Sequence, residues 1–350
     1  EEAHKRGIKI MLDAVFNHIG YQSAQWQDVL KNGENSPYKD WFHIQEFPVT
    51  EDKLQNPREL PYHTFAFASY MPKLNTANPE VRDYLLSVAT YWIENFDIDA
   101  WRLDVANEID HQFWRDFRKA VLAKKPDLYI LGEIWHTSQP WLQGDEFHAV
   151  MNYPLSESIK DYFLRQRKKT EQFISEINSQ SMYYKQQISE VMFNLLDSHD
   201  TERILTTAKG NIQHVKAALT FLYLQKGTPC IYYGTELALI GGPDPDCRRV
   251  MPWDRVSEDN DMLNFMKQLI QVRKEVASII QHGNYRLEEV KPDVLSLKWN
   301  YQGIEVQAIF NQSSEKYTLD RDSVDLASHC QFEDGQEVIL PDGFVITVSK

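Results

Sequence analysis

The sequence predicts an α/β fold: an incomplete eight-stranded parallel β/α barrel with about six of its strands, an inserted subdomain, and a C-terminal antiparallel β domain. Three observations support this fold class. Apolar runs of strand length alternate with helical patterns, the runs are apolar almost throughout, and polar residues follow the ends of several runs. Alternation favours parallel strands joined by helices, and continuous apolarity is typical of strands covered on both faces. The (β/α)8 TIM barrel is the closed form of that arrangement.

Six runs have the length and composition of buried strands. They cover residues 8–16, 98–104, 128–135, 147–151, 191–197 and 229–233. A closed barrel needs two strands more, and only residues 1–7 precede the first run. The chain also opens without an initiator Met, so we expect it to be the C-terminal portion of a longer protein.

Four segments between the runs have the apolar periodicity of amphipathic helices. They cover residues 79–96, 110–125, 211–225 and 262–275. In the first segment, Asn78 is a suitable N-cap and Pro79 fits the first helical position. The pattern predicts that the buried face of this helix consists of Val81, Tyr84, Leu85, Val88, Trp92 and Phe96.

Two stretches break the alternation and define the predicted domains. Residues 20–77 are rich in proline and aromatic residues and are too long for an ordinary connection, so they predict an inserted subdomain. Residues 285–350 alternate in apolarity on both sides of Gly303 and predict a small antiparallel, sandwich-like β domain. The partial catalytic barrel is therefore expected over residues 1–19 and 78–284.

Composition argues against several classes of protein. The net charge of −14 disfavours a nucleic-acid or anionic-membrane surface, and there is no apolar run of about 18 residues to span a bilayer. The cysteines Cys230, Cys247 and Cys330 form no CxxC pair, so neither a disulfide framework nor a cysteine zinc site is expected. A reducing, cytoplasmic location is the simplest interpretation.

Acidic residues follow four of the predicted strands, which is where the catalytic groups of a β/α barrel lie. Arg102 and Asp104 are two residues apart and share a strand face, where the guanidinium would keep the carboxylate ionised. Glu133 follows an apolar run and precedes Trp135, surroundings that suit a general acid. An ionised Asp and a protonatable Glu are the two groups that glycoside hydrolysis uses.

Other interpretations stay open for each residue taken alone. Arg102 and Asp104 could form only a structural ion pair, and Glu133 could cap a neighbouring segment. Metal binding by strand-end residues such as His18 and His199 is a further alternative, but no closely spaced His pair occurs, so no metal site is predicted. Several aromatic residues of the insertion could hold sugar rings or belong to a core: Trp41, Tyr62, Phe65, Phe67 and Tyr70.

In their order along the chain, the strand-end segments resemble the four signature regions of the α-amylase superfamily. They are residues 13–18, residues 101–104, the segment around Glu133, and residues 197–200. Residues 71–75 (MPKLN) and 105–108 (VANE) are similar to the neopullulanase, cyclomaltodextrinase and maltogenic amylase group. The resemblance covers roughly residues 8–280 and, more loosely, the C-terminal β domain.

The resemblance implies a role for each matching residue. Asp104 would be the nucleophile, Glu133 the general acid and then base, and Asp200 would bind sugar hydroxyls and stabilise the distorted ring. The remaining substrate-binding residues implied by the resemblance are His18, Arg102, Asn107, Glu108, Trp135, His199, Asp244 and Arg248. Asp13 and Asn17 would be structural.

The resemblance implies a retaining hydrolase of α-1,4 and some α-1,6 glucosidic bonds in cyclodextrins, maltooligosaccharides and pullulan, with transglycosylation. An oligo-1,6-glucosidase and a non-catalytic glucan-binding relative are the alternatives. No cofactor is expected, and the sequence locates no calcium site. The partners would be α-glucan oligosaccharides or cyclodextrins, not nucleic acid or membranes, with a homodimer formed through a domain that these residues lack. Made alone, the chain is expected to be inactive because its sheet edges would be open.

Overall fold

The structure is a computed structural model that describes residues 1–49, 60–319 and 324–349. Residues 50–59 of the predicted insertion and residues 320–323 of the predicted β domain therefore lie outside the described residues. The chain forms two compact units. The first comprises Glu1–Ile134 and Ser138–Met151, and the second comprises Trp135–Thr137 and Asn152–Lys350. The domain boundaries at residues 19, 77 and 284 stay predictions of the sequence.

The first unit is built on a parallel sheet of four short strands in chain order. They are β1 (Met11–Ala14), β2 (Ala100–Leu103), β3 (Tyr129–Gly132) and β4 (Ala149–Val150). The register pairs Asp13 with Arg102 and Leu103 with Gly132. Because parallel strands end at the same edge of a sheet, the residues that follow β2 and β3, Asp104 and Glu133, come to that edge together.

Three α-helices belong to the first unit, and two of them begin with an acidic or amide cap. They are α1 (Ala24–Asn32), α2 (Pro79–Phe96) and α3 (His111–Lys124). Asn78 accepts a hydrogen bond of 2.8 Å from the Glu80 amide, and Asp110 accepts one of 2.8 Å from the Phe113 amide. These caps satisfy amide groups that lack partners within the helix. The predicted helix over 79–96 is confirmed, and the helix predicted over 110–125 begins one residue later.

The buried face of α2 differs from the prediction. Its buried residues are Val81, Leu85, Ala89 and Ile93, whereas Tyr84, Trp92 and Phe96 are exposed. Two adjacent stripes of this helix are apolar, and the one with the smaller side chains packs inward. The aromatic stripe instead packs on itself, with the rings of Trp92 and Phe96 4.9 Å apart. Apolarity alone does not decide which of two neighbouring stripes is buried.

The second unit contains a further parallel pair of strands and most of the helices. The strands are β5 (Phe193–Asn194) and β6 (Thr228–Pro229). The helices are α4 (Tyr153–Ile159), α5 (Thr170–Ser181), α6 (Gln186–Ser189), α7 (Ile204–Thr207), α8 (Ile212–Tyr223) and α9 (Asp261–His282). Each of the six predicted apolar runs thus contains or adjoins a short parallel strand. Helix α9 extends past its predicted end at residue 275 to His282.

The antiparallel sheet predicted for the C-terminal part of the second unit is confirmed, and the sandwich-like arrangement stays a prediction. Its strands are β7 (Asn284–Lys291), β8 (Val294–Tyr301), β9 (Ile304–Asn311), β10 (Tyr317–Thr318), β11 (Leu326–Glu333) and β12 (Gln336–Ser349). The order is β10-β12-β9-β8-β7, with β11 also paired to β12. Gln302 and Gly303 both have positive φ, 51° and 83°, between β8 and β9. Two such residues form the tight turn that hairpins favour.

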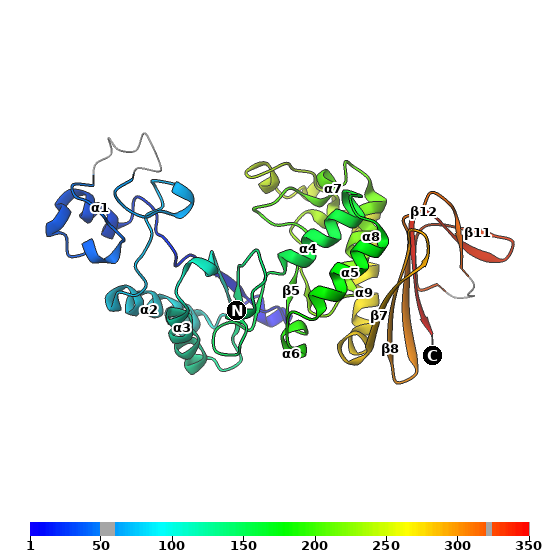
Figure 1. Ribbon diagram of the computed structural model, residues 1–350, viewed down its shortest axis with the longest axis horizontal. Coiled ribbons are helices and arrows are strands. Elements are labelled where there is room, and N and C mark those ends of the chain that lie inside the picture. The colour runs from blue at the N-terminus through cyan, green and yellow to red at the C-terminus, as the bar shows by residue number, and fades with distance from the viewer. Residues whose placement is uncertain (50–59, 320–323, 350) are drawn as a thin grey trace. The chain divides into compact units, whose positions relative to one another are not determined.

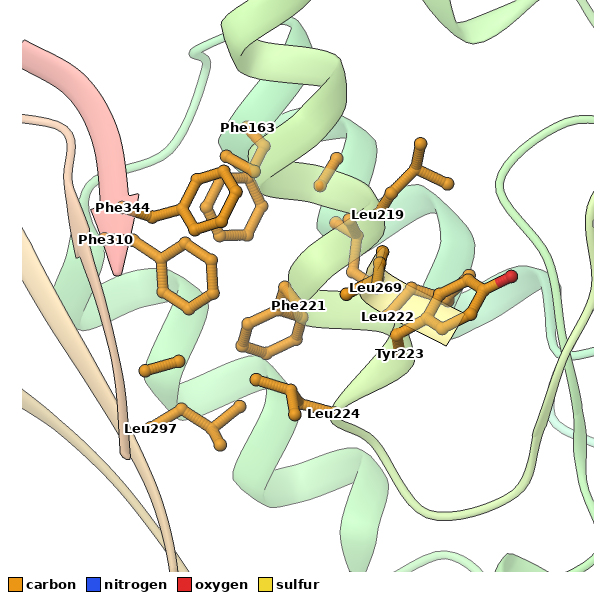
Figure 2. Close-up of a cluster of buried hydrophobic side chains, with 14 of the residues drawn as sticks. Phe163, Leu219, Phe221, Leu222, Tyr223, Leu224, Leu269, Leu297, Phe310 and Phe344 are labelled. Carbon is orange, nitrogen blue, oxygen red and sulfur yellow. The ribbon is translucent and has the colours of Figure 1, made fainter. Parts of the chain in front are cut away.

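Helix α8 and the C-terminal sheet share one hydrophobic core (Figure 2). Phe221 of α8 lies 6.0 Å from Phe310 of β9, measured between ring centroids, and Phe163 lies 5.2 Å from Phe310. Phe344 of β12 continues the cluster at 5.8 Å from Phe310. Burial of these rings is the main force that holds the sheet against the helices of this unit. The core thereby fixes the helix that leads into β6.

Candidate active site

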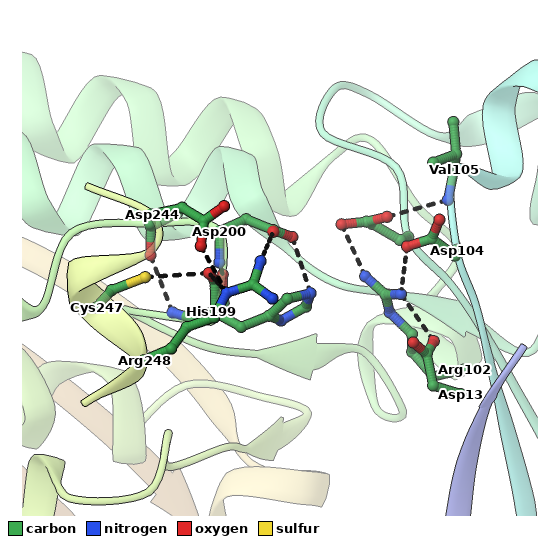
Figure 3. A network of polar contacts seen from close by, with 12 residues as sticks. Asp13, Arg102, Asp104, Val105, His199, Asp200, Asp244, Cys247 and Arg248 are labelled. Carbon is green, nitrogen blue, oxygen red and sulfur yellow. Dashed lines mark hydrogen bonds and ion pairs between the residues drawn. The ribbon is translucent and has the colours of Figure 1, made fainter. Parts of the chain in front are cut away.

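The predicted site residues divide between the two units. Those in the first unit are His18, Arg102, Asp104, Asn107, Glu108 and Glu133, and those in the second are Trp135, His199, Asp200, Asp244 and Arg248. Figure 3 draws polar contacts from both units. Each unit brings its own members of the set into contact.

In the first unit, a buried arginine faces three carboxyl groups (Figure 3). Arg102 Nη1 donates to Asp13 Oδ1 and to Asp104 Oδ1, both at 2.7 Å. Arg102 Nη2 lies 2.8 Å from Glu133 Oε1. The strand spacing predicts the Arg102–Asp104 pair. It does not reveal the contact with Glu133, because that residue arrives from the next strand of the sheet.

The electrostatics of this group are unbalanced, since one cation faces three carboxyl groups. Side-chain exposure falls from 53% for Asp13 to 18% for Asp104 and 5% for Glu133. Burial by itself lowers the pKa of Arg102. The attraction of Glu133 and Asp13 and the hydrogen bonds outweigh burial and raise that pKa above its ordinary value, so the guanidinium stays charged. Among the three, Glu133 loses the most hydration when it is ionised.

Backbone geometry after β2 and β3 also serves Glu133. The amide of Val105 donates to Glu133 Oε2 at 3.0 Å. Val105 has φ 44° and ψ 43°, a left-handed conformation that a β-branched residue rarely adopts, so the contact is made at a strained residue. Gly132, just before Glu133, leaves room for the ring of Phe147, which a Cβ at that position would approach to 2.6 Å.

A second polar group in the first unit centres on the buried Asn17. Lys73 Nζ donates to Asn17 Oδ1 and, at 3.0 Å, to the Glu108 carbonyl, while Asn17 Nδ2 lies 3.3 Å from Glu108 Oε2. The His18 ring stacks on Phe65 with centroids 4.9 Å apart. Burial lowers the pKa of His18 against the attraction of nearby carboxylates, so its imidazole is neutral near pH 7. Sequence reasoning misses the role of Lys73, although the motif at 71–75 contains it.

Asn107 and Glu108 occupy a short 3-10 turn, Ala106–Glu108, that follows Asp104 closely. The indole Nε1 of Trp114 in α3 donates to the Ala106 carbonyl at 2.8 Å and anchors the turn to that helix. The side chain of Asn107 is exposed. The turn is therefore held in place by α3, and it exposes the side-chain amide of Asn107 to solvent.

The second unit holds four predicted residues in a cluster of its own (Figure 3). His199 Nε2 lies 3.1 Å from Asp200 Oδ2, and Arg248 Nη2 lies 3.3 Å from Asp200 Oδ1. Arg248 Nε also donates to the His199 carbonyl at 3.0 Å and lies 2.7 Å from Asp244 Oδ1. These side chains are between 31% and 49% exposed. The cluster is held by loops and remains half open to water.

A buried arginine that sequence reasoning misses positions the loop of Asp244 and Arg248. Arg203 is fully buried, and its Nε donates to the Cys247 carbonyl at 2.8 Å. Its Nη1 donates to the Tyr233 carbonyl, and the guanidinium lies 4.0 Å from the centroid of the Tyr232 ring. One side chain thus joins the segment after β6 to the loop that carries Arg248. The position of Arg203, closely following the predicted segment 197–200, is the feature of the sequence that could have pointed to it.

Asp197 begins the segment 197–200 and is also buried. Its Oδ2 accepts hydrogen bonds from the Ile204 amide at 3.2 Å and from Thr235 Oγ1 at 2.9 Å. Burial raises the pKa of Asp197 to about 6, against the opposing effect of those hydrogen bonds. Asp197 therefore anchors the segment that leads to His199 and Asp200.

The predicted aromatic residues have different surroundings. Trp135 is 46% exposed and stacks on Tyr153, with centroids 3.8 Å apart and an angle of 7° between the rings. In the insertion, Trp41 and Tyr62 are buried in the core, whereas Phe67 and Tyr70 are exposed. Within the insertion, then, only Phe67 and Tyr70 of these four offer open faces.

Two kinds of feature are absent over residues 1–49, 60–319 and 324–349. No three His, Cys, Asp or Glu side chains are grouped so that they could hold a metal ion. Within the same ranges, no helix combines the length and the apolarity that crossing a bilayer requires.

Comparison with known proteins identifies the family. The model of the alpha amylase catalytic domain matches residues 1–324. The chain is 52% identical over 315 residues to an intracellular maltogenic amylase of Bacillus subtilis (strain 168), an overlap that covers 89% of this chain and 52% of the relative. It is 45% identical over 322 residues to neopullulanase 2 of Thermoactinomyces vulgaris, covering 91% of this chain and 54% of the relative.

Among solved structures, a cyclomaltodextrinase matches with a TM-score of 0.89 and 42% identity, over 100% of this chain and 61% of that one. The chain spans about half the length of the curated relatives it matches. The chain belongs to the alpha-amylase family, where it resembles the maltogenic amylases, cyclomaltodextrinases and neopullulanases.

Proposed function

We propose that the whole protein is a retaining glycoside hydrolase that cleaves α-1,4 and some α-1,6 glucosidic bonds in cyclodextrins, maltooligosaccharides and pullulan, and that it also transfers glycosyl groups. The observation that carries the proposal is the contact of one buried guanidinium, that of Arg102, with both Asp104 and Glu133. Two carboxyl groups held side by side at the ends of neighbouring strands are what double displacement requires.

The surroundings of the two carboxyl groups support different roles. Asp104 accepts a hydrogen bond from the charged guanidinium of Arg102, which holds its carboxyl group in place and suits a nucleophile. Glu133 is the least exposed of the three carboxyl groups that share one cation, and burial disfavours the charged form of a carboxyl group, which suits a general acid. We therefore assign Asp104 as the nucleophile and Glu133 as the general acid.

The reaction proceeds in two balanced steps. Asp104 attacks the anomeric carbon and forms an ester bond to it, while Glu133 gives its proton to the departing glycosidic oxygen. Glu133, now a carboxylate, takes a proton from water, whose oxygen attacks the same carbon and releases Asp104. When a sugar hydroxyl replaces water, the outcome is transglycosylation.

The remaining predicted residues have supporting roles in this proposal. Asp200 binds hydroxyls of the sugar, and His199 and Arg248 hold its carboxylate through the contacts at 3.1 and 3.3 Å. A neutral His18 donates to or accepts from a sugar hydroxyl. Asn107, Glu108, Trp135 and Asp244 are proposed to contact neighbouring sugar units.

The six parallel strands fit the β/α-barrel class that the family match indicates, and the number of strands in the whole protein stays a prediction. Hydrolysis by double displacement needs water as its only co-reactant, so no cofactor is proposed to take part in the reaction. A homodimer is an expectation from the resemblance, a cytoplasmic location is an expectation from the cysteine content, and the sequence locates no calcium site.

The test replaces the general acid. In the whole protein, Glu133→Gln is expected to lower kcat on maltotriose by about 100- to 10,000-fold, because the proton donor is lost while the shape is kept. Glu94→Gln, which neutralises an exposed glutamate on α2, is the matched control and should keep its rate. Near-normal hydrolysis by Glu133→Gln would remove Glu133 from this role. Activity on isomaltose but not on cyclodextrin would favour an oligo-1,6-glucosidase.

A further inference from the structure

We propose that a pocket in the second unit binds a segment of an α-glucan at a second site, separate from the residues that carry the proposed reaction. The pocket has a volume of about 480 Å³. Ligand pockets in proteins commonly measure about 300–1,000 Å³, so a short oligosaccharide segment is of suitable size. The choice of α-glucan over other sugars rests on the proposed function.

The pocket lies at the opposite end of the strands from His199 and Asp200. Met192, in its wall, immediately precedes β5, and Lys226, also in its wall, shortly precedes β6. His199 and Asp200 instead follow β5 along the chain. The elements around it are α4, α5 and α6 together with β7 and β8, all in the second unit (Figure 1). A ligand in this pocket would therefore bind at a site separate from His199 and Asp200.

The wall of the pocket has the chemistry that recognises a neutral sugar. Tyr183 and Tyr184 supply aromatic rings, and Asn178, Gln180 and Gln186 supply amide groups. The described residues that line the pocket include no carboxylate and a single cation, the half-buried Lys226. Aromatic rings pack against the apolar faces of a sugar ring, and amides exchange hydrogen bonds with its hydroxyls. Among the described lining residues, a charged ligand could form an ion pair only with Lys226.

Gln180, in the wall of the pocket, has a buried hydrogen-bond acceptor without a partner among the described residues. Its Nε2 donates to the Pro154 carbonyl at 3.2 Å and to Ser158 Oγ at 2.9 Å, and Ser158 Oγ in turn donates to Glu176. A carbonyl can only accept, so this bond fixes which end of the amide is which. Gln180 Oε1 is buried and has no hydrogen-bond partner in the described part of the chain. A buried acceptor without a partner is costly, and a ligand hydroxyl in the pocket would satisfy it once the Gln180 side chain shifts enough to expose Oε1.

The rear wall of the pocket is already rigid. The Trp299 indole donates to the Leu224 carbonyl at 2.8 Å, and the Tyr285 ring lies 4.7 Å from it. Lys226 Nζ lies 5.8 Å from the centroid of the Trp299 ring, a cation–π contact. A preformed wall spares a ligand the entropic cost of ordering side chains.

The experiment measures binding of maltotetraose to the whole protein carrying Glu133→Gln, by isothermal titration calorimetry. Tyr184→Ala is expected to weaken binding in one class of sites about fivefold, and Gln180→Leu is expected to weaken the same class. Tyr184→Phe keeps the ring and should keep the affinity, which separates loss of a contact from loss of fold. Tyr91→Ala, at a tyrosine of α2 that is 51% exposed, is the matched control.

Hydrolysis supplies an independent readout. With Glu133 intact, the pocket variants should keep kcat and KM for maltotriose and raise KM for soluble starch by about the same factor as they weaken binding. The proposal is overturned if Tyr184→Ala and Gln180→Leu bind maltotetraose as the Tyr91→Ala control does, or if cellotetraose binds as tightly. A protein without hydrolytic activity whose pocket variants still lose affinity would contradict the proposed reaction and keep this site.

Discussion

The two polar clusters at the strand ends are built in opposite ways. Arg102 and Glu133 are about 10% and 5% exposed and lie on or directly after strands of a sheet. Arg248 and Asp200 are 45% and 31% exposed and lie on loops. Contacts between charges are strong where water is excluded and weak where water screens them. The contrast teaches that the first cluster depends on its arginine for stability, whereas the second can position a ligand at little cost to its own stability.

The largest effect is expected from breaking the first cluster. Arg102→Met leaves the buried Glu133 and its neighbours Asp13 and Asp104 without their cation, which should lower the free energy of unfolding by about 3–5 kcal/mol. Chemical denaturation of the whole protein measures this. A loss below about 1 kcal/mol would mean that the guanidinium is no stronger a link than a surface ion pair, and the comparison would fail.

A smaller effect sharpens the comparison through pH. Asp197, unlike Glu133, is buried without an ion-pair partner among the described residues, and burial raises its pKa to about 6. Its unfolded pKa is about 3.9, so the folded state keeps a proton that the unfolded state has already lost. Stability therefore falls as pH rises from about 4 through 6, by about 3 kcal/mol for this group alone.

Asp197→Asn should remove that part of the pH dependence, because the amide oxygen can still accept from Ile204 and Thr235. The measurement is the difference in denaturation midpoint between the protein and the variant across this pH range. Asp127→Asn, at an exposed aspartate, is the control and should leave the profile unchanged. A profile for Asp197→Asn that runs parallel to that of the parent would contradict the argument.

The smallest effect on stability is expected in the second cluster. Arg248→Met removes contacts to Asp200 and Asp244 that are largely screened, so it should cost about 0–1 kcal/mol of unfolding free energy. Its effect should be seen in KM for maltooligosaccharides, since Asp200 loses a group that holds its carboxylate. A destabilisation as large as that of Arg102→Met would show that the two clusters are alike after all.

Much of the fold follows from local patterns that the sequence displays. The bounds of α2 follow from Asn78 and Pro79 at its start, and each predicted apolar run contains or adjoins a short parallel strand. The buried face of α2 does not follow, because two stripes are apolar and only packing selects Val81 and Leu85 over Tyr84. Periodicity locates a helix more reliably than it orients one.

The candidate site shows the same division. The pair Arg102 and Asp104 is readable because both residues lie on one strand, where spacing fixes direction. The contact of Arg102 with Glu133 depends on the register between β2 and β3, which no local pattern encodes. Arg203 is missed for a similar reason, since its partners Tyr233 and Cys247 are distant in the chain. The sequence therefore does not reveal which distant residues a buried arginine will contact.

The most direct test of the account is to identify the residue that becomes bonded to sugar. The whole protein would be incubated with an activated fluoro-glucoside that slows release of the glycosyl group, then digested and examined by mass spectrometry. We predict a single added glycosyl group, attached through an ester to Asp104 and lost in the Asp104→Asn variant. Attachment to another residue, or turnover of the reagent by Asp104→Asn at the parent rate, would contradict it.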